Sequence, residues 1–330
     1  MRSFELYDAT TVEEAVQLLE QYGPAAKIVA GGSDLVTGVM KDYVQGPGMP
    51  YPEVLIDITT IPEMTGIAVQ NGGMTIGTAT TLTDIIDSGE IQTGWPVLAN
   101  AAESVASVMI RNFGTLGGNI NQRPRCWFLR GPHFDCYKKG GDFCYAVTGD
   151  NRPHAIIGGE LCYIVHPSDT ATALLALNAA TTIAGPDGRR TVTFDEYFIG
   201  PRTDVLRENI LQHNELMVDV QVPTLSPETK TVWHKLKDRQ VYDFAVVSVA
   251  VVANIQDGVW QDGRIVLGGV APVPWRASAV EQALAGNDVS STIRSAAALI
   301  RNEARPLSNN GYKVQLAIGL TERAVLETLA

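Results

Sequence analysis

Four cysteines give the strongest chemical signal in this 330-residue sequence, which contains no others. They are Cys126, Cys136, Cys144 and Cys162, separated by 9, 7 and 17 residues. A structural zinc site usually includes two cysteines only two to four residues apart, and this sequence has no such pair. Widely spaced thiolates from one segment can instead hold an iron–sulfur cluster, which needs four of them. The residues alone leave three interpretations open: an iron–sulfur cluster, a zinc site, or free buried thiols.

Two glycine-rich loops suggest a phosphate-bearing ligand. The first, Gly31-Gly32-Ser33-Asp34, follows the apolar stretch 26–30 and precedes a helical pattern. A strand that enters such a turn exposes backbone N–H groups, which suits a pyrophosphate. The second runs from Gly114 to Asn119 and offers a backbone that a ligand can approach closely. For each loop a tight structural turn is the competing interpretation, and neither matches the dinucleotide-binding fingerprint GxGxxG.

The cysteines lie in a segment with no helical or strand periodicity. Residues 121–152 mix Pro, Gly, Arg and Lys with aromatic residues. Loops this long are uncommon in compact domains unless they are functional or disordered. The density of aromatic residues argues against disorder, because such side chains tend to pack. We therefore expect an irregular but ordered loop, held together by a bound group.

The surrounding pattern predicts the elements that position these loops. A helix should begin after Thr11, a long buried helix should span 97–109, and a hairpin should turn at 71–73. Strands are expected at 155–159 and 161–165. They lead to a turn at 166–169, where Ser168 or Asp169 should cap a helix over 170–177. No catalytic residue is assigned, and His166 is expected to be structural.

A composition shift at 224–230 predicts a linker between two domains, 1–224 and 225–330. Strands at 231–239, 244–255 and 263–270 precede helices at 278–285, 289–303 and 314–329. A run of strands followed by a run of helices is typical of an α+β module. The overall fold class predicted is therefore α+β.

The formal net charge of −11 argues against a nucleic-acid partner, because phosphate recognition needs a basic surface. No apolar run approaches the roughly 20 residues needed to cross a bilayer, so no membrane insertion is expected. The first residues contain no apolar signal region, which predicts a cytoplasmic chain in a reducing compartment. Export together with a partner that carries its own signal would instead place the protein in the periplasm.

These motifs together resemble the FAD-binding medium subunit of the molybdenum hydroxylases, the xanthine dehydrogenase and carbon monoxide dehydrogenase group. The resemblance covers essentially the whole chain. It lies in the order and spacing of several short motifs, listed here from the N-terminus: Ala30 to Leu35, Ile110 to Ile120, Ser168-Asp169, Lys235, Arg239, Asp243-Phe244-Ala245, Ala271 to Ala277, and Arg323-Ala324. One departure is Met109, where many relatives have glutamine.

The resemblance implies an FAD-binding fold shared with the vanillyl-alcohol oxidase and p-cresol methylhydroxylase group, followed by a CO dehydrogenase flavoprotein-like C-terminal α+β domain. It also implies which residues contact FAD. They are Ile28, Val29, Ala30, Gly31, Gly32, Ser33 and Asp34 in the first loop, Gly114, Thr115, Gly117, Gly118 and Asn119 in the second, and Ser168, Asp169 and Lys235.

The cysteine-rich loop, 121–165, is similar to an insertion in periplasmic-type bacterial aldehyde oxidoreductases, whose FAD subunit also holds a [4Fe–4S] cluster. The resemblance thus implies Cys126, Cys136, Cys144 and Cys162 as cluster ligands. It further implies an electron-transfer subunit of a heterotrimer, with a large molybdenum-cofactor subunit, a small [2Fe–2S] subunit and an external electron acceptor. The alternatives are the flavin subunit of a 4-hydroxybenzoyl-CoA reductase-like or xanthine dehydrogenase-like enzyme, a self-contained flavin oxidase, and a zinc-stabilised binding protein.

Overall fold

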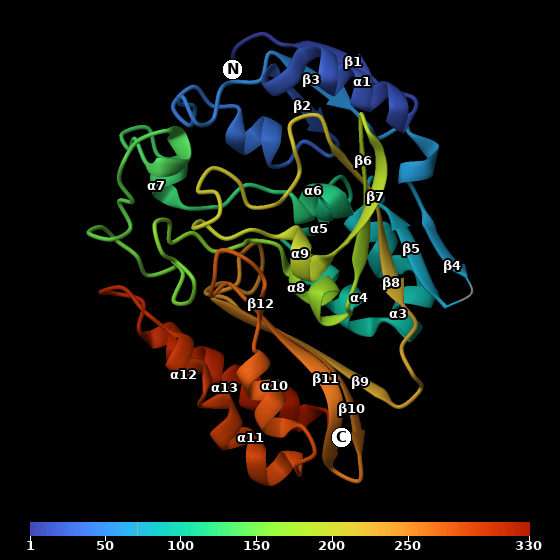
Figure 1. Ribbon diagram of the computed structural model, residues 1–330, viewed down its shortest axis with the longest axis vertical. Coiled ribbons are helices and arrows are strands. Elements are labelled where there is room, and N and C mark those ends of the chain that lie inside the picture. The colour runs from blue at the N-terminus through green and yellow to red at the C-terminus, as the bar shows by residue number, and fades with distance from the viewer. Residues whose placement is uncertain (71) are drawn as a thin grey trace.

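Three β-sheets follow one another along the long axis of the computed structural model, which describes residues 1–70 and 72–330 (Figure 1). The first sheet is parallel, with strand order β1-β3-β2. The second is an antiparallel five-stranded sheet, β4-β5-β8-β6-β7, and the third an antiparallel four-stranded sheet, β12-β11-β10-β9. The strands are β1 (Glu5–Asp8), β2 (Ala26–Val29), β3 (Val54–Asp57), β4 (Ile67–Gln70), β5 (Gly73–Gly77), β6 (Ala180–Gly185), β7 (Gly188–Thr193), β8 (Leu216–Pro223), β9 (Thr229–Leu236), β10 (Val247–Gln256), β11 (Val259–Gly268) and β12 (Trp275–Arg276).

Helices connect and cover these sheets. Those of the first 200 residues are α1 (Val12–Tyr22), α2 (Leu82–Asp87), α3 (Gly89–Gly94), α4 (Pro96–Glu103), α5 (Val108–Arg111), α6 (Leu116–Ile120), α7 (Trp127–Arg130), α8 (Asp169–Ala176) and α9 (Phe194–Tyr197). Short 3-10 or π turns lie at η1 (Gly23–Ala25), η2 (Leu35–Val39), η3 (Pro62–Met64) and η4 (Tyr137–Lys139). The last sheet is covered by α10 (Ser278–Leu284), α11 (Val289–Ala297), α12 (Ile300–Glu303) and α13 (Tyr312–Glu327). None of the described helices is long and apolar enough to span a bilayer.

Two helix starts follow directly from local sequence. Thr11 caps α1 by accepting a hydrogen bond from the backbone N–H of Glu14, as its hydroxyl predicted. Ser168 does the same for α8, accepting from the backbone N–H of Ala171. The predicted hairpin is present as the antiparallel pair β4 and β5, although Asn71 in its turn lies outside the described residues.

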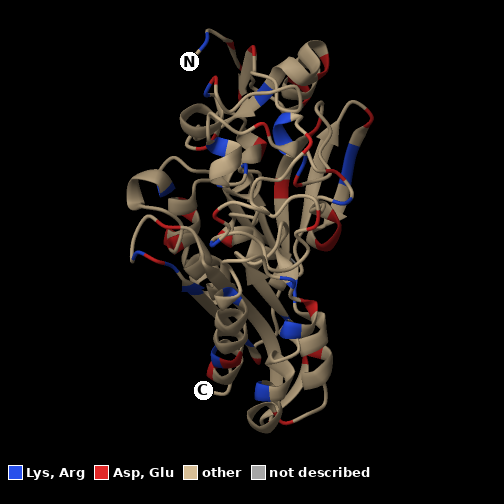
Figure 2. Cartoon of the chain, turned by 90° about the vertical axis from the view of Figure 1, so that its left-hand side faces the viewer, with Lys and Arg blue, Asp and Glu red and all other residues tan. Residues whose placement is uncertain are grey.

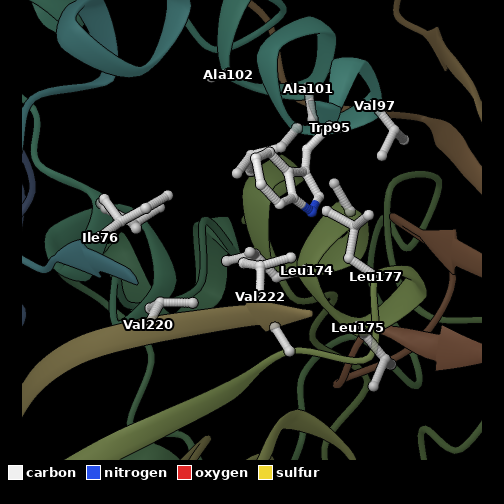
Figure 3. Close-up of a cluster of buried hydrophobic side chains, with 14 of the residues drawn as sticks. Ile76, Trp95, Val97, Ala101, Ala102, Leu174, Leu175, Leu177, Val220 and Val222 are labelled. Carbon is white, nitrogen blue, oxygen red and sulfur yellow. The ribbon is translucent and has the colours of Figure 1, made fainter. Parts of the chain in front are cut away.

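The central core lies between α4, α8 and the inner face of the five-stranded sheet (Figure 3). Trp95 precedes α4, and its ring lies among the side chains of Leu174, Leu177 and Val222. Its indole N–H donates to the carbonyl oxygen of Pro223 over 2.8 Å, so the large apolar ring is buried without an unpaired donor. This packing holds α8, and with it the turn at 166–169, against the sheet.

Two predictions about local structure were wrong. The helix expected over 97–109 is interrupted after Glu103, since Ala106 has a φ of 43° and its carbonyl accepts from the N–H of Tyr242. The strands expected at 155–159 and 161–165 are irregular, because Leu161 has a φ of 67° and the chain turns back on itself. Ile156 and Ile157 are still buried, but they pack on the core of the C-terminal sheet and not in a strand ladder, whereas Leu161 is exposed.

The remaining C-terminal elements occur in the predicted order, except that the helix expected over 289–303 is divided into α11 and α12. The residues that precede α8 join the two halves of the chain. Ile156 and Ile157 both donate backbone hydrogen bonds to the carbonyl oxygen of Val270, and His166 donates to that of Ala271. His166 is buried, and its ring lies edge-on to Phe198 with centroids 4.8 Å apart.

Burial lowers the pKa of His166 to about 4, so this imidazole is neutral in the folded protein at pH 7. In the unfolded chain its pKa should be about 6.5. Between these pH values the unfolded state binds more protons than the folded state. The contribution of His166 to the free energy of unfolding is therefore complete above pH 6.5 and is lost as the pH falls towards 4. The shift corresponds to roughly 3 kcal/mol. We expect His166→Gln to flatten the stability–pH curve in this window, measured by urea denaturation.

His133, which is exposed, supplies the matched control. His133→Gln should leave the slope of stability against pH unchanged, because this side chain is in solvent in both states. An unaltered slope in His166→Gln would contradict the assignment of the effect to His166.

Candidate functional site

The first glycine loop follows β2 and presents a row of free backbone donors. Among the described residues, no acceptor is found for the backbone N–H groups of Gly31, Gly32, Ser33 and Asp34. Successive N–H groups of this kind form a concave anion-binding nest. The side chains of the preceding residues are used differently. Val29 is buried with Met40 and Leu55, and Ile28 and Ala30 pack on the core beneath α1. The side chain of Val29 is therefore occupied in the core, and those of Ile28 and Ala30 are partly so.

The second glycine loop lies directly against the first. A Cβ atom on Gly31 would collide with the carbonyl oxygen of Phe113, so only glycine permits this approach. The amides of the second loop are mostly engaged within the protein: Gly117 donates to the carbonyl oxygen of Thr78 and Gly118 to the hydroxyl of Thr115. The two loops thus share one site, in which the first supplies free donors and the second supplies close packing.

The turn at 166–169 joins this site through buried hydroxyl groups. The Oδ1 atom of Asn119 accepts hydrogen bonds from Ser168 (2.6 Å) and Thr170 (2.7 Å). All three side chains are buried. Asn119 and Ser168, predicted as separate ligand contacts, are therefore bonded to each other and fix the distance between the second loop and α8.

Asp169 and Lys235 form a buried ion pair with an N–O distance of 2.6 Å. The ammonium also donates to the carbonyl oxygen of Ser104, so it has two acceptors. Burial raises the pKa of Asp169 above its ordinary value, and the nearby Lys235 opposes that shift. The pair ties α8 to β9, and removing one partner alone would leave an uncompensated buried charge.

Asp34 has no free oxygen directed at a ligand, because basic groups from the cysteine-rich loop surround it. Its Oδ2 atom accepts from the backbone N–H of Arg123 over 2.7 Å. Its Oδ1 atom forms ion pairs with Arg125 (3.0 Å) and Arg130 (2.9 Å). Sequence reasoning missed these three arginines as functional residues. The only signal available was their clustering around Cys126.

All four cysteines line one small cavity, although they are spread over a long irregular loop. The space that the centre of a water molecule can occupy in this cavity is about 20 Å³, which is enough for one water. The thiols are free, and three of the four are buried. The other lining residues are Phe128, Leu129, Tyr137, Lys138, Tyr145, His154, Tyr163 and Ile164.

The pKa values of Cys126, Cys144 and Cys162 are shifted in different directions. Burial raises the pKa of Cys126 to about 12. The neighbouring Cys162 thiol lowers the pKa of Cys144 to about 6, and Cys144 in turn raises that of Cys162. Ligating thiols must be deprotonated, so only a strongly positive metal centre would convert all four to thiolates.

His154 also contacts this cavity, and sequence reasoning missed it. Its Nε2 atom lies 3.2 Å from the sulfur of Cys126, while its buried Nδ1 atom has no partner among the described residues. Burial lowers the pKa of His154 to about 4, so the ring is neutral at pH 7 and carries one proton. We place that proton on Nε2, where the sulfur can accept it.

A single-ion site is not preformed. Among residues 1–70 and 72–330, no group of three or more His, Cys, Asp or Glu side chains is arranged to hold one metal ion. A tetrahedral zinc site would need its four sulfurs about 3.8 Å apart, as follows from Zn–S bonds of about 2.3 Å. The arrangement therefore does not favour the zinc alternative.

Comparisons with known proteins agree with the predicted fold along the whole chain. A family model described as "FAD binding domain in molybdopterin dehydrogenase" matches residues 2–225. A second model, "CO dehydrogenase flavoprotein C-terminal domain", matches residues 232–328. The predicted fold class, an FAD-binding fold followed by a CO dehydrogenase flavoprotein C-terminal α+β fold, is thereby confirmed.

Individual relatives cover nearly all of this chain. The aldehyde oxidoreductase FAD-binding subunit PaoB of Escherichia coli (strain K12) is 33% identical, with 96% of this chain and 95% of that protein aligned. The carbon monoxide dehydrogenase medium chain of Hydrogenophaga pseudoflava is 31% identical, with 98% and 96% aligned.

A solved structure of the Hydrogenophaga pseudoflava carbon monoxide dehydrogenase superposes with a TM-score of 0.77 at 30% identity. The match covers 99% of this chain and 98% of that one. This chain belongs to the FAD-binding medium subunits of the molybdenum hydroxylase family and is an oxidoreductase subunit.

Proposed function

We propose that this chain carries FAD and a [4Fe–4S] cluster as the electron-transfer subunit of a heterotrimeric aldehyde oxidoreductase. A large subunit would hold the molybdenum cofactor and oxidise the substrate, and a small [2Fe–2S] subunit would deliver the electrons. The external acceptor would then be reduced at this chain. Support for the aldehyde class comes from the relative named as an aldehyde oxidoreductase subunit, at 33% identity. The xanthine dehydrogenase FAD-binding subunit of Escherichia coli O157:H7 is less similar, at 25%.

The convergence of all four cysteines on one cavity is the observation that carries the cluster proposal. None of the four cysteines lies in one of the strands, so no strand ladder brings them together. Four thiol donors and no competing carboxylate match the ligand set of a [4Fe–4S] cluster.

The fit for FAD rests on the two glycine loops. The free amides of residues 31–34 would hold the diphosphate, and the close approach of the second loop would bound it on one side. The bound flavin supplies the redox chemistry, while the protein supplies position and electrostatics. Asp169 and Lys235 would act as a fixed ion pair near the flavin, and Ser168 and Asn119 would hold the second loop to α8.

The same geometry supports electron transfer over a self-contained flavin oxidase. A flavin oxidase needs an acid or base directed at its substrate. In the part of the chain that the structure describes, Asp34 and Asp169 are both paired with cations, and His166 is buried and neutral. We retain the division into domains 1–224 and 225–330 as part of this proposal.

Replacing one cluster ligand tests the proposal. The protein purified with its partners should contain about four iron atoms per chain in addition to the iron of the small subunit. Cys162→Ser should remove most of these four, since an alcohol is a poor ligand for iron in a cluster. Iron, flavin and molybdenum are quantified on the same sample, and the isolated chain should show no substrate turnover.

Thr148→Ala is the control, because Thr148 is exposed in the same loop and should leave the iron content unchanged. Protein that contains flavin but no iron attributable to this chain would refute the cluster. Zinc without flavin would refute the whole assignment.

A second prediction concerns His154. Its Nε2–H group would donate to the Cys126 sulfur, and such hydrogen bonds stabilise the reduced, more negative state of a cluster. His154→Phe keeps a ring but removes the donor. We expect the midpoint potential of the cluster in this variant to fall by about 20–60 mV. This range corresponds to about 0.5–1.5 kcal/mol for one hydrogen bond in a one-electron couple.

The potential is measured by a redox titration followed by electron paramagnetic resonance. The exposed His133→Phe variant should titrate like the wild type. An equal or higher potential in His154→Phe would contradict the proposed hydrogen bond.

A further inference from the structure

The chain that follows the first glycine loop is held at several points by the cysteine-rich loop. Asp34 contacts its arginines, as described above. Lys139 donates from its Nζ atom to the carbonyl oxygen of Tyr43 (3.0 Å), and its own carbonyl accepts from the N–H of Gly48 (2.9 Å). A Cβ atom on Gly46 would collide with the same carbonyl. Residues 34–48 therefore contact the cysteine-rich loop at several points, and the adjacent blue and green ribbons in Figure 1 show the two segments side by side.

Asp34 is the contact that lies closest to the proposed diphosphate site. Its side chain is only 15% exposed, and both oxygens are used by residues 123–130. It also belongs to the row of residues whose backbone N–H groups are free. One residue thus has its amide directed to the ligand site and its carboxylate directed to the cysteine-rich loop.

The two arginines on Asp34 flank Cys126. Arg125 directly precedes Cys126. Helix α7 starts directly after Cys126, at Trp127, and ends at Arg130. Arg130 also donates to the carbonyl oxygens of Pro124 and Arg123, both over 2.9 Å, and its N–H bonds to the carbonyl of Cys126. Residues 123–130 are therefore one closed turn around Cys126. Displacement of this cysteine would move both guanidinium groups.

The cysteine-rich loop has little regular structure to keep it ordered by itself. Within residues 121–165 the structure shows only α7, η4 and a single bridge between Cys136 and Phe143. Its own hydrophobic cluster is small and centres on Phe128, Cys144 and Ala146. Segments with few ladder hydrogen bonds open at low free-energy cost. A cluster bound to Cys126 would restrict the loop further, and with it the positions of the two arginines.

Charge determines how movement of these arginines would affect the first glycine loop. Arg125 and Arg130 neutralise Asp34, which lies beside the amides proposed to bind a diphosphate. If both arginines moved away, the carboxylate would repel that diphosphate at short range, and the repulsion is strong where water is partly excluded. The amides of residues 31–34 would also lose their fixed geometry.

We propose that Arg125 and Arg130 are positioning residues that couple the two cofactor sites through Asp34, so that an assembled cluster strengthens FAD binding. This inference rests on the proposed function, because it requires both cofactors on one chain. Thermodynamic linkage makes the effect reciprocal, so bound FAD also favours retention of the cluster. A coupling of this kind typically changes affinity by about 5- to 150-fold.

FAD titration of the full chain, with and without its iron, tests this coupling. The dissociation constant is measured by flavin fluorescence on iron-loaded protein and on protein stripped by oxidation and chelation. We expect the constant of the wild type to rise by about 5- to 150-fold when the iron is removed. In Arg130→Gln the loaded protein should keep its iron but bind FAD more weakly, and iron removal should change its affinity by less than about twofold, since most of the coupling is lost.

Three further variants separate the coupling through Asp34 from general destabilisation. Arg130→Lys keeps the positive charge and should recover part of the coupling, and Arg125→Gln provides a second break if Arg130→Gln does not fold. Arg189→Gln removes ion pairs with Glu13 and Glu63, which lie outside the cysteine-rich loop, and should leave the coupling intact.

The outcomes are distinguishable. Equal FAD affinities for loaded and stripped wild type, with about four iron atoms in the loaded chain, would overturn the coupling and leave the proposed function standing. Full coupling in both Arg130→Gln and Arg125→Gln would overturn the role of the two arginines. Protein that never holds iron would overturn the cluster and the coupling together.

Discussion

Buried backbone polar groups need hydrogen-bond partners, and in the cysteine-rich loop several of these partners are distant side chains. Lys313 is fully buried and donates to the carbonyl oxygens of Pro153, His154 and Gly269. Asn310 donates to the carbonyl oxygens of His154 and Ala155. The start of α13 and the residues just before it thus hold one side of the loop, and Asp34 with its arginines holds the other. Both halves of the chain must fold before this loop has a defined shape.

Buried ion pairs connect segments that are far apart in sequence. Lys138, beside the cysteine cavity, pairs with Glu208, and Glu208 also pairs with Arg123. Asp169 and Lys235 link α8 to β9. Buried pairs of this kind contribute little net stability, because desolvation offsets their attraction. Their effect here is geometric, since each pair joins elements that are distant in sequence. In the view of Figure 2, acidic and basic residues are interspersed along the chain.

The sheets and helices were largely predictable, because their signals are local. Hydroxyl caps located α1 and α8, and the order of strands and helices after residue 224 followed from periodicity. The exceptions occurred where a contact from elsewhere overrides local preference. Ala106 interrupts a helical pattern because the loop carrying Tyr242 bonds to its carbonyl. Residues 155–165 look like strands because many are apolar, but Ile156 and Ile157 pack on the C-terminal sheet outside any ladder.

The sequence by itself determined the two glycine loops, the set of four cysteines and the family to which the chain belongs. Each of these depends on residue types and on short spacings along the chain. The tertiary structure decided which groups meet: Asp34 with Arg125 and Arg130, Asn119 with Ser168, His154 with Cys126, and the four thiols around one cavity. Periodicity cannot reveal such contacts, because they depend on how an irregular loop packs between two folded halves and on which buried charges find a partner there.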